Sequence, residues 1–449
     1  MQNETIAAIS TAPGIGAISI VRMSGEDALE ILGKFFQSTH TSPFSSHTIR
    51  YGKIKDGDQL IDEVLVSYFK APKTFTREDM VEINTHGGVY IAERVLGLCL
   101  SHGARLAENG EFTERAFLNG RIDLTEAESV LDLIESRSEL SLKLATQGLE
   151  GKIRDLTESL RTRLLNVIAQ IEVNIDYPEY DDVQELTQNV LIPETQTIQS
   201  MLKKIPDQAV YGQLIKDGIS TAIVGRPNVG KSSLLNALIN EEKAIVTDIQ
   251  GTTRDTVEGR LTIGGVTLNL IDTAGIRDTS DQVEKIGIEK SVKAIESARL
   301  VLLVIDQSQP LQDDDKKLLS MTESKERIVI LNKDDLPKKM NHDFPDAIPI
   351  SSLLKQNLNV LETRIHEMYL SGYLDSTQTV YLSNARHIGK FKEALSLVNQ
   401  ALETAHNDFP VDMIEMDLKE AWLRLGEVMG EVSDTALIDT LFSQFCLGK

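Results

Sequence analysis

The sequence has few cysteines, no long hydrophobic run and no signal-peptide pattern. Its two cysteines, Cys99 and Cys446, are too few for a disulfide framework or a four-ligand zinc site, so a reducing cytoplasm is the expected location. The longest apolar stretch, residues 300–305, is far too short to cross a bilayer, and we expect no membrane association. The N-terminus lacks a basic segment followed by an apolar run, which argues against a signal peptide.

Basic residues are scarce relative to acidic ones. The chain has 46 Lys and Arg residues against 68 Asp and Glu residues, which gives a formal net charge of −22. Such a chain repels nucleic acid unless basic groups cluster locally, so any RNA contact should be local or carried by a partner. Its 449 residues exceed the size of one hydrophobic core, which predicts about two to four domains.

The first part of the chain, residues 1–120, mixes two kinds of hydrophobic periodicity. Residues 18–21 and 64–69 have the composition of strands, whereas residues 28–36 and 90–101 have the apolar spacing of helices. These residues are therefore predicted to form a small α+β domain.

Two other parts of the chain, residues 121–217 and 379–449, have helical spacing, most clearly at 124–176 and 190–204. Between them, residues 218–373 alternate strands with helices, which is typical of a parallel α/β sheet. The simplest organisation is one discontinuous α-helical domain with the α/β domain inserted into it, since insertion is tolerated where chain ends lie close together. The alternative is two separate helical domains, each small for a stable core.

A phosphate-binding motif of the form GxxxxGKS occupies Gly225–Ser232. It follows the predicted strand 220–224 and opens the predicted helix 233–238, which is the context that a P-loop requires. Backbone N–H groups and the helix N-terminus cradle phosphate, Lys231 reaches the β- and γ-phosphates, and Ser232 ligates magnesium. The alternative is an ordinary glycine turn before a helix, which does not require all the residues of the GxxxxGKS motif.

A second motif, Asp-x-x-Gly, ends the predicted strand 268–271. Asp272 can hold the magnesium shell, and the Gly275 N–H can meet the γ-phosphate, so this loop would sense hydrolysis. Alone the motif is a common strand-to-turn sequence, but at this distance after a P-loop it indicates a nucleotide site.

A third motif, Asn332-Lys333-Asp334-Asp335, matches Asn-Lys-x-Asp and follows the predicted strand 328–331. The Asp335 carboxylate can accept hydrogen bonds from the guanine N1–H and 2-amino groups, a pair that adenine lacks, so the site should prefer GTP. Ser351-Ser352 stands where such domains place a last base-contacting loop, usually Ser-Ala.

The loop at residues 245–255 should provide a hydroxyl that reaches magnesium when the γ-phosphate is present, and Thr253 is the candidate. A solvated Gly/Thr loop is the alternative. Ile276 stands where Ras-like switches have the glutamine that orients the attacking water, and isoleucine cannot do so. Arg277 and Glu284 are the candidates for that task, although a charged run on a loop is usually just solvated.

By these motifs the chain resembles a known family, the tRNA-modification GTPases called MnmE or TrmE, over nearly its whole length. The most specific matching segments are Gly110–Asn119, Gly251–Asp255, Asp272–Arg277, Glu284–Glu289 and Phe445–Lys449. Family members commonly end Phe-Cys-Ile-Gly-Lys, so Leu447 is a mild departure. The resemblance implies a Ras-like GTPase domain inserted in the helical domain.

The resemblance also implies a homodimer joined through the N-terminal domains, with the GTPase domains approaching each other when GTP binds. It implies a potassium ion beside the phosphates, held by Asn228, Thr247, Ile249 and Thr252. That ion would neutralise charge in the transition state as an arginine finger does. Glu284 would then orient the water.

A tetrahydrofolate site in the N-terminal domain is a further implication of the resemblance. The matching residues are Arg22, Glu82, Arg121 and Lys449, and many family members have lysine where Arg121 stands. Cys446 lies close to this site by the resemblance. It is either a small buried side chain or a thiol in the modification chemistry.

The catalytic residues expected are Lys231, Arg277 and Glu284, with magnesium on Ser232 and Thr253. Motifs and resemblance together predict that GTP contacts the following residues: Asn228, Val229, Gly230, Lys231, Ser232, Ser233, Thr247, Asp248, Ile249, Gln250, Gly251, Thr252, Thr253, Asp272, Thr273, Ala274, Gly275, Asn332, Lys333, Asp335, Ser351 and Ser352.

The function implied by the resemblance is GTP hydrolysis coupled to modification of tRNA. With a FAD-containing partner of the MnmG (GidA) family, in a heterotetramer or larger complex, the protein would place an aminomethyl-type group, such as carboxymethylaminomethyl, on C5 of the wobble uridine. The folate would supply the one-carbon unit. The alternative is a ribosome-assembly or signalling switch that acts by binding a partner, for which a basic RNA-binding appendage would be expected.

Overall fold

The computed structural model describes residues 4–176, 187–239, 257–271, 292–372, 379–407, 409–431 and 435–449. The chain divides into two compact units. The first comprises residues 1–131, 148–161 and 422–449, and the second comprises residues 132–147 and 162–421.

The first unit is built on a mixed sheet in the order β3-β4-β5-β6-β2-β1-β7, antiparallel except for the β1–β7 pair. Its strands, with the bounds observed in the described residues, are β1 Ile6–Ile9, β2 Ile18–Ser24, β3 Phe36–Ser38, β4 Thr48–Asp56, β5 Gln59–Phe69, β6 Met80–His86 and β7 Arg105–Leu106. Alternate residues such as Val21, Met23, Val64 and Val66 form the buried face of this sheet, as the period of a strand requires.

Three helices accompany this sheet: α1 Ala28–Gly33, α2 Val89–Ser101 and α3 Glu111–Leu118. The N-terminal α+β domain predicted from the sequence is therefore confirmed. The helix expected over residues 28–36 is too long, because it ends at Gly33 and Phe36 opens strand β3. Phe36 pairs with Ile54 of β4, and burial of Phe35 and Phe36 beneath this edge of the sheet outweighs the helical spacing.

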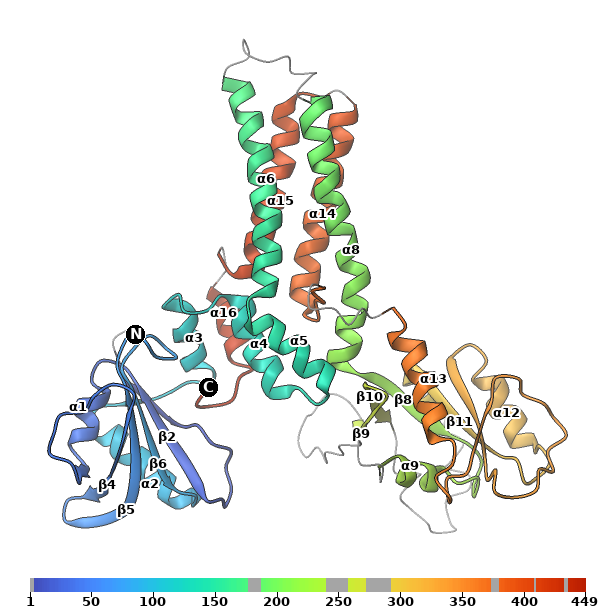
Figure 1. Ribbon diagram of the computed structural model, residues 1–449, viewed down its shortest axis with the longest axis horizontal. Coiled ribbons are helices and arrows are strands. Elements are labelled where there is room, and N and C mark those ends of the chain that lie inside the picture. The colour runs from blue at the N-terminus through green and yellow to red at the C-terminus, as the bar shows by residue number, and fades with distance from the viewer. Residues whose placement is uncertain are drawn as a thin grey trace. The chain divides into compact units, whose positions relative to one another are not determined.

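Helical segments lie on both sides of the α/β domain in the sequence. Those described are α4 Leu124–Glu135, α5 Glu139–Leu149, α6 Lys152–Asp176, a π-helical turn at Thr187–Leu191, α8 Ile192–Asp217, α14 Ala385–His406, α15 Val411–Met429 and α16 Thr435–Phe442. Helices α8 and α14 run side by side (Figure 1), and Gln199 donates a hydrogen bond to Asn399 across them at 2.7 Å. The helical pieces before and after the α/β domain therefore pack together, which confirms one discontinuous helical domain.

Helix α8 is longer than the predicted stretch of residues 190–204. It continues through Pro206 to Asp217, although proline removes one backbone hydrogen bond from a helix. Ile205 and Ala209 are buried on the face that continues the apolar spacing of Ile198 and Leu202, so tertiary packing offsets the missing bond.

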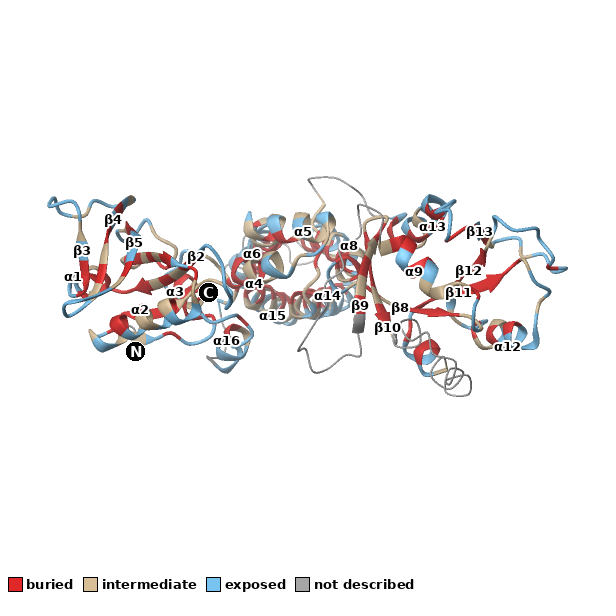
Figure 2. Cartoon of the chain, turned by 90° about the horizontal axis from the view of Figure 1, so that it is seen from below, coloured by how far each residue is buried: buried red, intermediate tan, exposed pale blue. Residues whose placement is uncertain are grey.

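The inserted domain has a sheet in the order β13-β12-β11-β8-β10-β9, parallel except for the β9–β10 hairpin. Its elements in the described residues are β8 Ile219–Val224, α9 Lys231–Ile239, β9 Val257–Ile263, β10 Val266–Ile271, β11 Leu300–Asp306, α12 Asp313–Met321, β12 Glu326–Asn332, β13 Ile348–Ile350 and α13 Leu358–Leu370. Strand β11 is buried along its whole length, and it lies in the middle of the sheet (Figure 2). Such a strand is expected where helices cover both faces of a parallel sheet.

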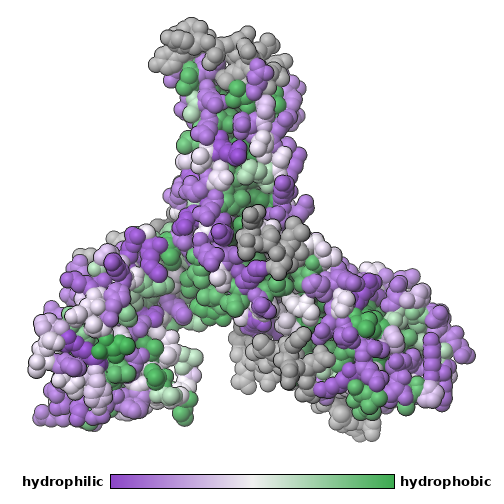
Figure 3. Space-filling view, viewed as in Figure 1, coloured by the Kyte–Doolittle hydropathy of each residue, from purple (hydrophilic) through white to green (hydrophobic). Residues whose placement is uncertain are grey.

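Hydrophilic side chains cover much of the molecular face seen in Figure 3. Within the described part of the chain, no helix combines the length and apolar character needed to cross a membrane.

Candidate functional site

The P-loop connects β8 to α9 at the carboxyl end of the parallel strands, as the sequence predicts. Asn228 has φ +63° and Gly230 has φ +97°, so the backbone turns through the left-handed region twice. At Gly230 a Cβ atom would also collide with the side-chain amide of Asn332, and at Gly225 it would collide with the carbonyl of Val304. Glycine is therefore required at both positions by close approach of a neighbouring group, and at Gly230 by the backbone conformation as well.

The Lys231 side chain folds back into this loop. Its Nζ donates hydrogen bonds to the carbonyl oxygens of Gly225 at 2.8 Å and Arg226 at 2.9 Å. Burial lowers the pKa of Lys231 from its usual value. A half-buried cation among backbone groups at a helix N-terminus is an arrangement suited to a polyphosphate. Ser232 and Ser233 follow in the first turn of α9.

Asn332, at the end of β12, links the P-loop to the loop after β13. Its Nδ2 donates to the Val229 carbonyl at 2.8 Å, and its Oδ1 accepts from the Ser352 N–H at 3.1 Å and the Ser352 hydroxyl at 2.8 Å. Asn332 is 2% exposed, so all these bonds are sheltered from water. The phosphate loop and the candidate base-contacting loops therefore form one connected unit.

The other two residues of the Asn-Lys-x-Asp motif are also held in place. Lys333 has φ +67° and pairs with Asp306 at 2.7 Å. Burial alone would raise the pKa of Asp306, but hydrogen bonds from Lys333 and Ser308 hold it below its usual value. The exposed Asp335 carboxylate accepts a 2.6 Å bond from the hydroxyl of Ser351, which is itself buried.

A second cluster lies in the N-terminal domain. Arg22 on β2 pairs with Glu82 on β6 at 2.8 Å, and Arg22 also donates to the Gly448 carbonyl at 3.3 Å. The structure thus brings the C-terminal tail to two of the predicted folate residues. Arg121 is exposed and lies over the Phe75 ring at 4.9 Å, while the Lys449 carbonyl accepts a bond from the Phe112 N–H at 3.1 Å.

Some contacts of this tail were not predicted from the sequence. Ser10 donates to the Gly448 carbonyl at 3.1 Å, and Gly448 has φ +85° with its Cα so close to Ile9 that a Cβ would lie 2.5 Å from the Ile9 carbonyl. A glycine one residue from the C-terminus is the only signal that could have pointed to this close approach. Cys446 is exposed, so its interpretation as a small buried side chain is wrong. The buried cysteine is Cys99, and burial raises the pKa of its thiol to about 12.

Comparison with known proteins identifies the family of this chain. The family model described as the MnmE helical domain matches residues 124–446, and the one described as the GTP-binding protein TrmE N-terminus matches residues 5–121. The tRNA modification GTPase MnmE of Streptococcus thermophilus strain CNRZ 1066 is 52% identical over 453 residues, which cover 99% of this chain and 98% of that protein. The chain belongs to the MnmE family.

As an MnmE-family protein, this chain is a GTPase that acts in tRNA modification. The tRNA modification GTPase MnmE of Lactococcus lactis subsp. cremoris strain MG1363 is 50% identical over 448 residues, covering 99% of this chain and 98% of that protein. Among solved structures, the G domain of the T. maritima FeoB iron transporter is 27% identical, with a TM-score of 0.22, and the match covers 33% of this chain and 97% of that one.

Part of the predicted site of this MnmE-family protein lies outside the described residues. This applies to the following positions: Thr247, Asp248, Ile249, Gln250, Gly251, Thr252, Thr253, Asp272, Thr273, Ala274, Gly275, Arg277 and Glu284. The β9–β10 hairpin joins the two segments that contain them, since β9 begins at Val257 and β10 ends at Ile271.

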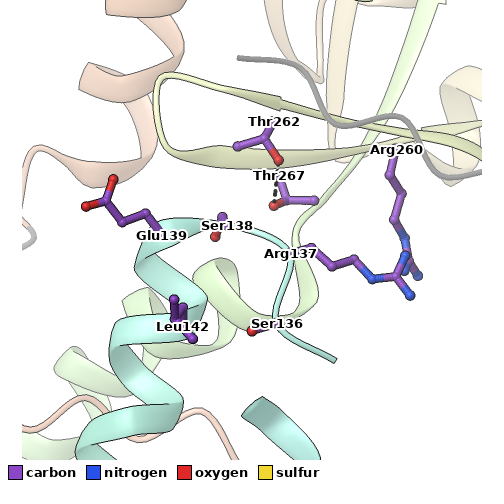
Figure 4. Close-up of a pocket in the computed structure, with 8 residues that line it drawn as sticks. All are labelled: Ser136, Arg137, Ser138, Glu139, Leu142, Arg260, Thr262 and Thr267. Atoms are coloured by element: carbon purple, nitrogen blue, oxygen red, sulfur yellow. Dashed lines mark hydrogen bonds between the residues drawn. The ribbon is translucent and has the colours of Figure 1, made fainter. Parts of the chain in front are cut away.

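The packing of this hairpin against helix α5 was not predicted from the sequence. Leu140 and Leu144 of α5 pack on the core of the GTPase domain, and Leu140 lies against Gly265 at the tip of the hairpin. A cavity of about 340 Å³ opens beside this contact (Figure 4), where Arg137 and Arg260 extend on the same side. The residues that line it are Ser136, Arg137, Ser138, Glu139, Leu142, Arg260, Thr262 and Thr267.

Proposed function

We propose that this enzyme binds magnesium-GTP between its P-loop and its Asn-Lys-x-Asp loop, and that hydrolysis drives modification of C5 of the wobble uridine in tRNA. The observation that carries the nucleotide assignment is the buried Asn332 side chain, which joins Val229 of the P-loop to Ser352 of the last loop. One ligand contacting both loops would have phosphates at one end and a purine at the other.

The metal ions fit the donor chemistry of this site. Magnesium prefers oxygen ligands, and Ser232 places a hydroxyl in the first turn of α9, one residue after the half-buried Lys231. Thr253 is the proposed second magnesium ligand. The exposed Asn228 amide, held at φ +63° in the P-loop, is proposed to bind potassium together with Thr247, Ile249 and Thr252.

Exchange of potassium for sodium should lower GTP turnover by about tenfold or more at equal ionic strength, because an ion near the phosphates neutralises transition-state charge. The measurement is steady-state phosphate release from the purified full chain in each salt. Asn228→Ala is expected to remove the difference between the two salts. A turnover rate that is the same in both salts, and slow without a partner, would instead favour the partner-binding switch.

We also propose a tetrahydrofolate derivative as ligand of the N-terminal domain. The Arg22–Glu82 pair is only partly exposed, at 22% and 21% of its two side chains, and it adjoins the backbone of the C-terminal tail. A guanidinium can bind the glutamate carboxylates of a folate, and a carboxylate can accept bonds from its pterin ring. Arg121 and Lys449 would add positive charge, and the folate would supply a one-carbon unit near the exposed Cys446.

The outer face of the N-terminal sheet supports the proposed homodimer. Ile49, Tyr51 and Leu65 are 65%, 44% and 47% exposed, and Tyr51 is paired directly with Leu65 between β4 and β5. Figure 3 shows hydrophobic side chains gathered on the surface of this domain. Exposed apolar surface of this kind commonly marks a protein interface.

A chain with a net charge of −22 binds tRNA poorly by itself, which supports a partner that helps to bind the tRNA. The proposed partner is a FAD-containing flavoprotein of the MnmG family, and the proposed location of the complex is the cytoplasm.

The domain boundaries we propose are residues 1–120, 121–217, 218–373 and 379–449, and the two family models likewise meet between residues 121 and 124.

The modification itself is tested by deleting the gene and measuring wobble uridine by nucleoside mass spectrometry. We expect loss of the 5-carboxymethylaminomethyl-type nucleoside, and its return when the gene is supplied on a plasmid. Fully modified uridine in the deletion strain would show that the protein does not take part in this reaction.

A further inference from the structure

One side chain of the P-loop reaches away from the loop to the segment after β11. Arg226 is 10% exposed, and its Nε lies 3.2 Å from Oδ2 of Asp315 in α12. Its terminal NH2 group donates to Oε1 of Gln309 at 2.9 Å. The guanidinium thus contacts two points of the β11–α12 connection, a geometry that a planar fork of donors allows.

The acidic partner of this arginine is buried and well held. Asp315 is 1% exposed, and its Oδ2 accepts a 3.0 Å bond from the backbone N–H of Gln312 in a capping box at the start of α12. A carboxylate removed from water requires a compensating charge, and Arg226 provides it. Within the described residues, Arg226 Nε and Asp315 Oδ1 have no hydrogen-bond partner, so this pair links the P-loop to α12 by charge, and the bond to Gln309 orients the guanidinium.

The same β11–α12 connection also holds the base-recognition loop. Asp306 pairs with Lys333 at 2.7 Å, and the Gln307 side chain donates to Asp334 at 2.6 Å. Residues 306–315 therefore contact the phosphate loop at one end and the Asn-Lys-x-Asp loop at the other. Arg226 is the side chain through which the P-loop takes part in this arrangement.

We propose that Arg226 is a positioning residue for nucleotide binding, which acts through the backbone of the P-loop and not by touching the nucleotide. Its ion pair with Asp315 and its hydrogen bond to Gln309 restrain the backbone of residues 225 and 226, whose carbonyl oxygens accept hydrogen bonds from the Lys231 ammonium. This inference rests on the proposed assignment of the P-loop as the phosphate site. A free Arg226 would let these carbonyls move, and Lys231 would lose its fixed position.

The test uses Arg226→Met in the full chain, with GDP affinity and dissociation rate measured with a fluorescent GDP analogue and with thermal unfolding as a second readout. We expect GDP affinity to fall by about tenfold or more, mainly through faster dissociation. The ratio of GDP to inosine diphosphate affinity should not change, because Asp335 reads the 2-amino group independently. The matched control is Arg327→Met, which also removes an arginine that bonds near the end of α12, at Thr322.

A double variant separates positioning from stability. Arg226→Met alone leaves a buried carboxylate without its partner and should lower the unfolding midpoint. Arg226→Met combined with Asp315→Asn removes both charges and keeps an oxygen for the Gln312 N–H. The unfolding midpoint should therefore recover, while GDP affinity stays low.

Three results would overturn the inference: GDP affinity of Arg226→Met equal to that of the control, affinity that recovers together with the unfolding midpoint in the double variant, or a changed preference between GDP and inosine diphosphate. If Arg226→Met does not fold, the GDP affinity of the double variant, compared with that of the control Arg327→Met, tests the inference. Absence of GDP binding by the unaltered chain would contradict the proposed nucleotide site itself, which distinguishes that failure from this one.

Discussion

Replacement of Asp335 by asparagine is expected to weaken GTP binding by about a hundredfold and to turn the base preference from guanine towards xanthine. Two hydrogen bonds to a charged acceptor are worth about 1.5 kcal/mol each at the lower end, and each 1.4 kcal/mol is tenfold in affinity. We use the lower end of this range of hydrogen-bond energies because the Asp335 side chain is exposed to water. Its carboxylate is already oriented by the Ser351 hydroxyl at 2.6 Å, so little ordering is needed when guanine binds.

An asparagine presents one acceptor and one donor, which matches the N1–H and 2-oxo groups of xanthine better than the two donors of guanine. The measurement is the affinity of the purified variant for GTP and for xanthosine triphosphate, by calorimetry in magnesium buffer. Asp334→Asn is the matched control, because it makes the same change one residue earlier, where the carboxylate accepts a bond from Gln307. Equal losses in both variants would show that the loop, and not base recognition by Asp335, had been disturbed.

The elements that could be predicted best are those whose chemistry lies in one short segment. The P-loop needs two glycines, a lysine and a hydroxyl at fixed spacing between a strand and a helix, and β8 and α9 stand on either side of it as expected. Strand β11 could be expected from its apolar composition, since a strand buried on both faces of a parallel sheet has a nearly continuous apolar run.

Contacts between distant segments could not be predicted in this way. In the described part of the chain, helix α9, the β9–β10 hairpin and strand β11 lie between Arg226 and Asp315, and each residue looks in the sequence like an ordinary surface charge. The contact of Leu140 with the hairpin at Gly265 has the same character, because an apolar residue in a helix does not specify its partner. The register of a helix or strand follows from local spacing, whereas the choice of neighbour depends on the whole fold.

The end of helix α1 and the exposure of Cys446 show how packing changes a local expectation. Phe35 and Phe36 continue the apolar spacing of the helix, yet both are buried where Phe36 pairs with β4 as a strand. Cysteine is usually buried, but Cys446 follows Phe445, which takes the buried position in the tail and leaves its neighbour exposed.

Replacement of Glu284 by alanine should lower GTP turnover by about a hundredfold while nucleotide affinity stays near normal. Ile276 stands where a glutamine would orient the attacking water, and a hydrocarbon side chain has neither donor nor acceptor. A carboxylate that orients the water, directly or through a second water, acts only on the reaction. Its removal should therefore appear in kcat, and hardly in the affinity for GDP.

The control for this variant is Glu289→Ala, which removes an identical side chain five residues later in the same segment. Single-turnover hydrolysis with potassium present should be slow for Glu284→Ala and close to normal for Glu289→Ala. GDP affinity measured on the same preparations decides between two roles. Should Glu284→Ala lose affinity as much as it loses turnover, the carboxylate would be needed to build the nucleotide site and another group, with Arg277 the first candidate, would have to serve the water. A normal affinity together with slow hydrolysis leaves only a role in the chemical step, because a group needed for binding would affect both.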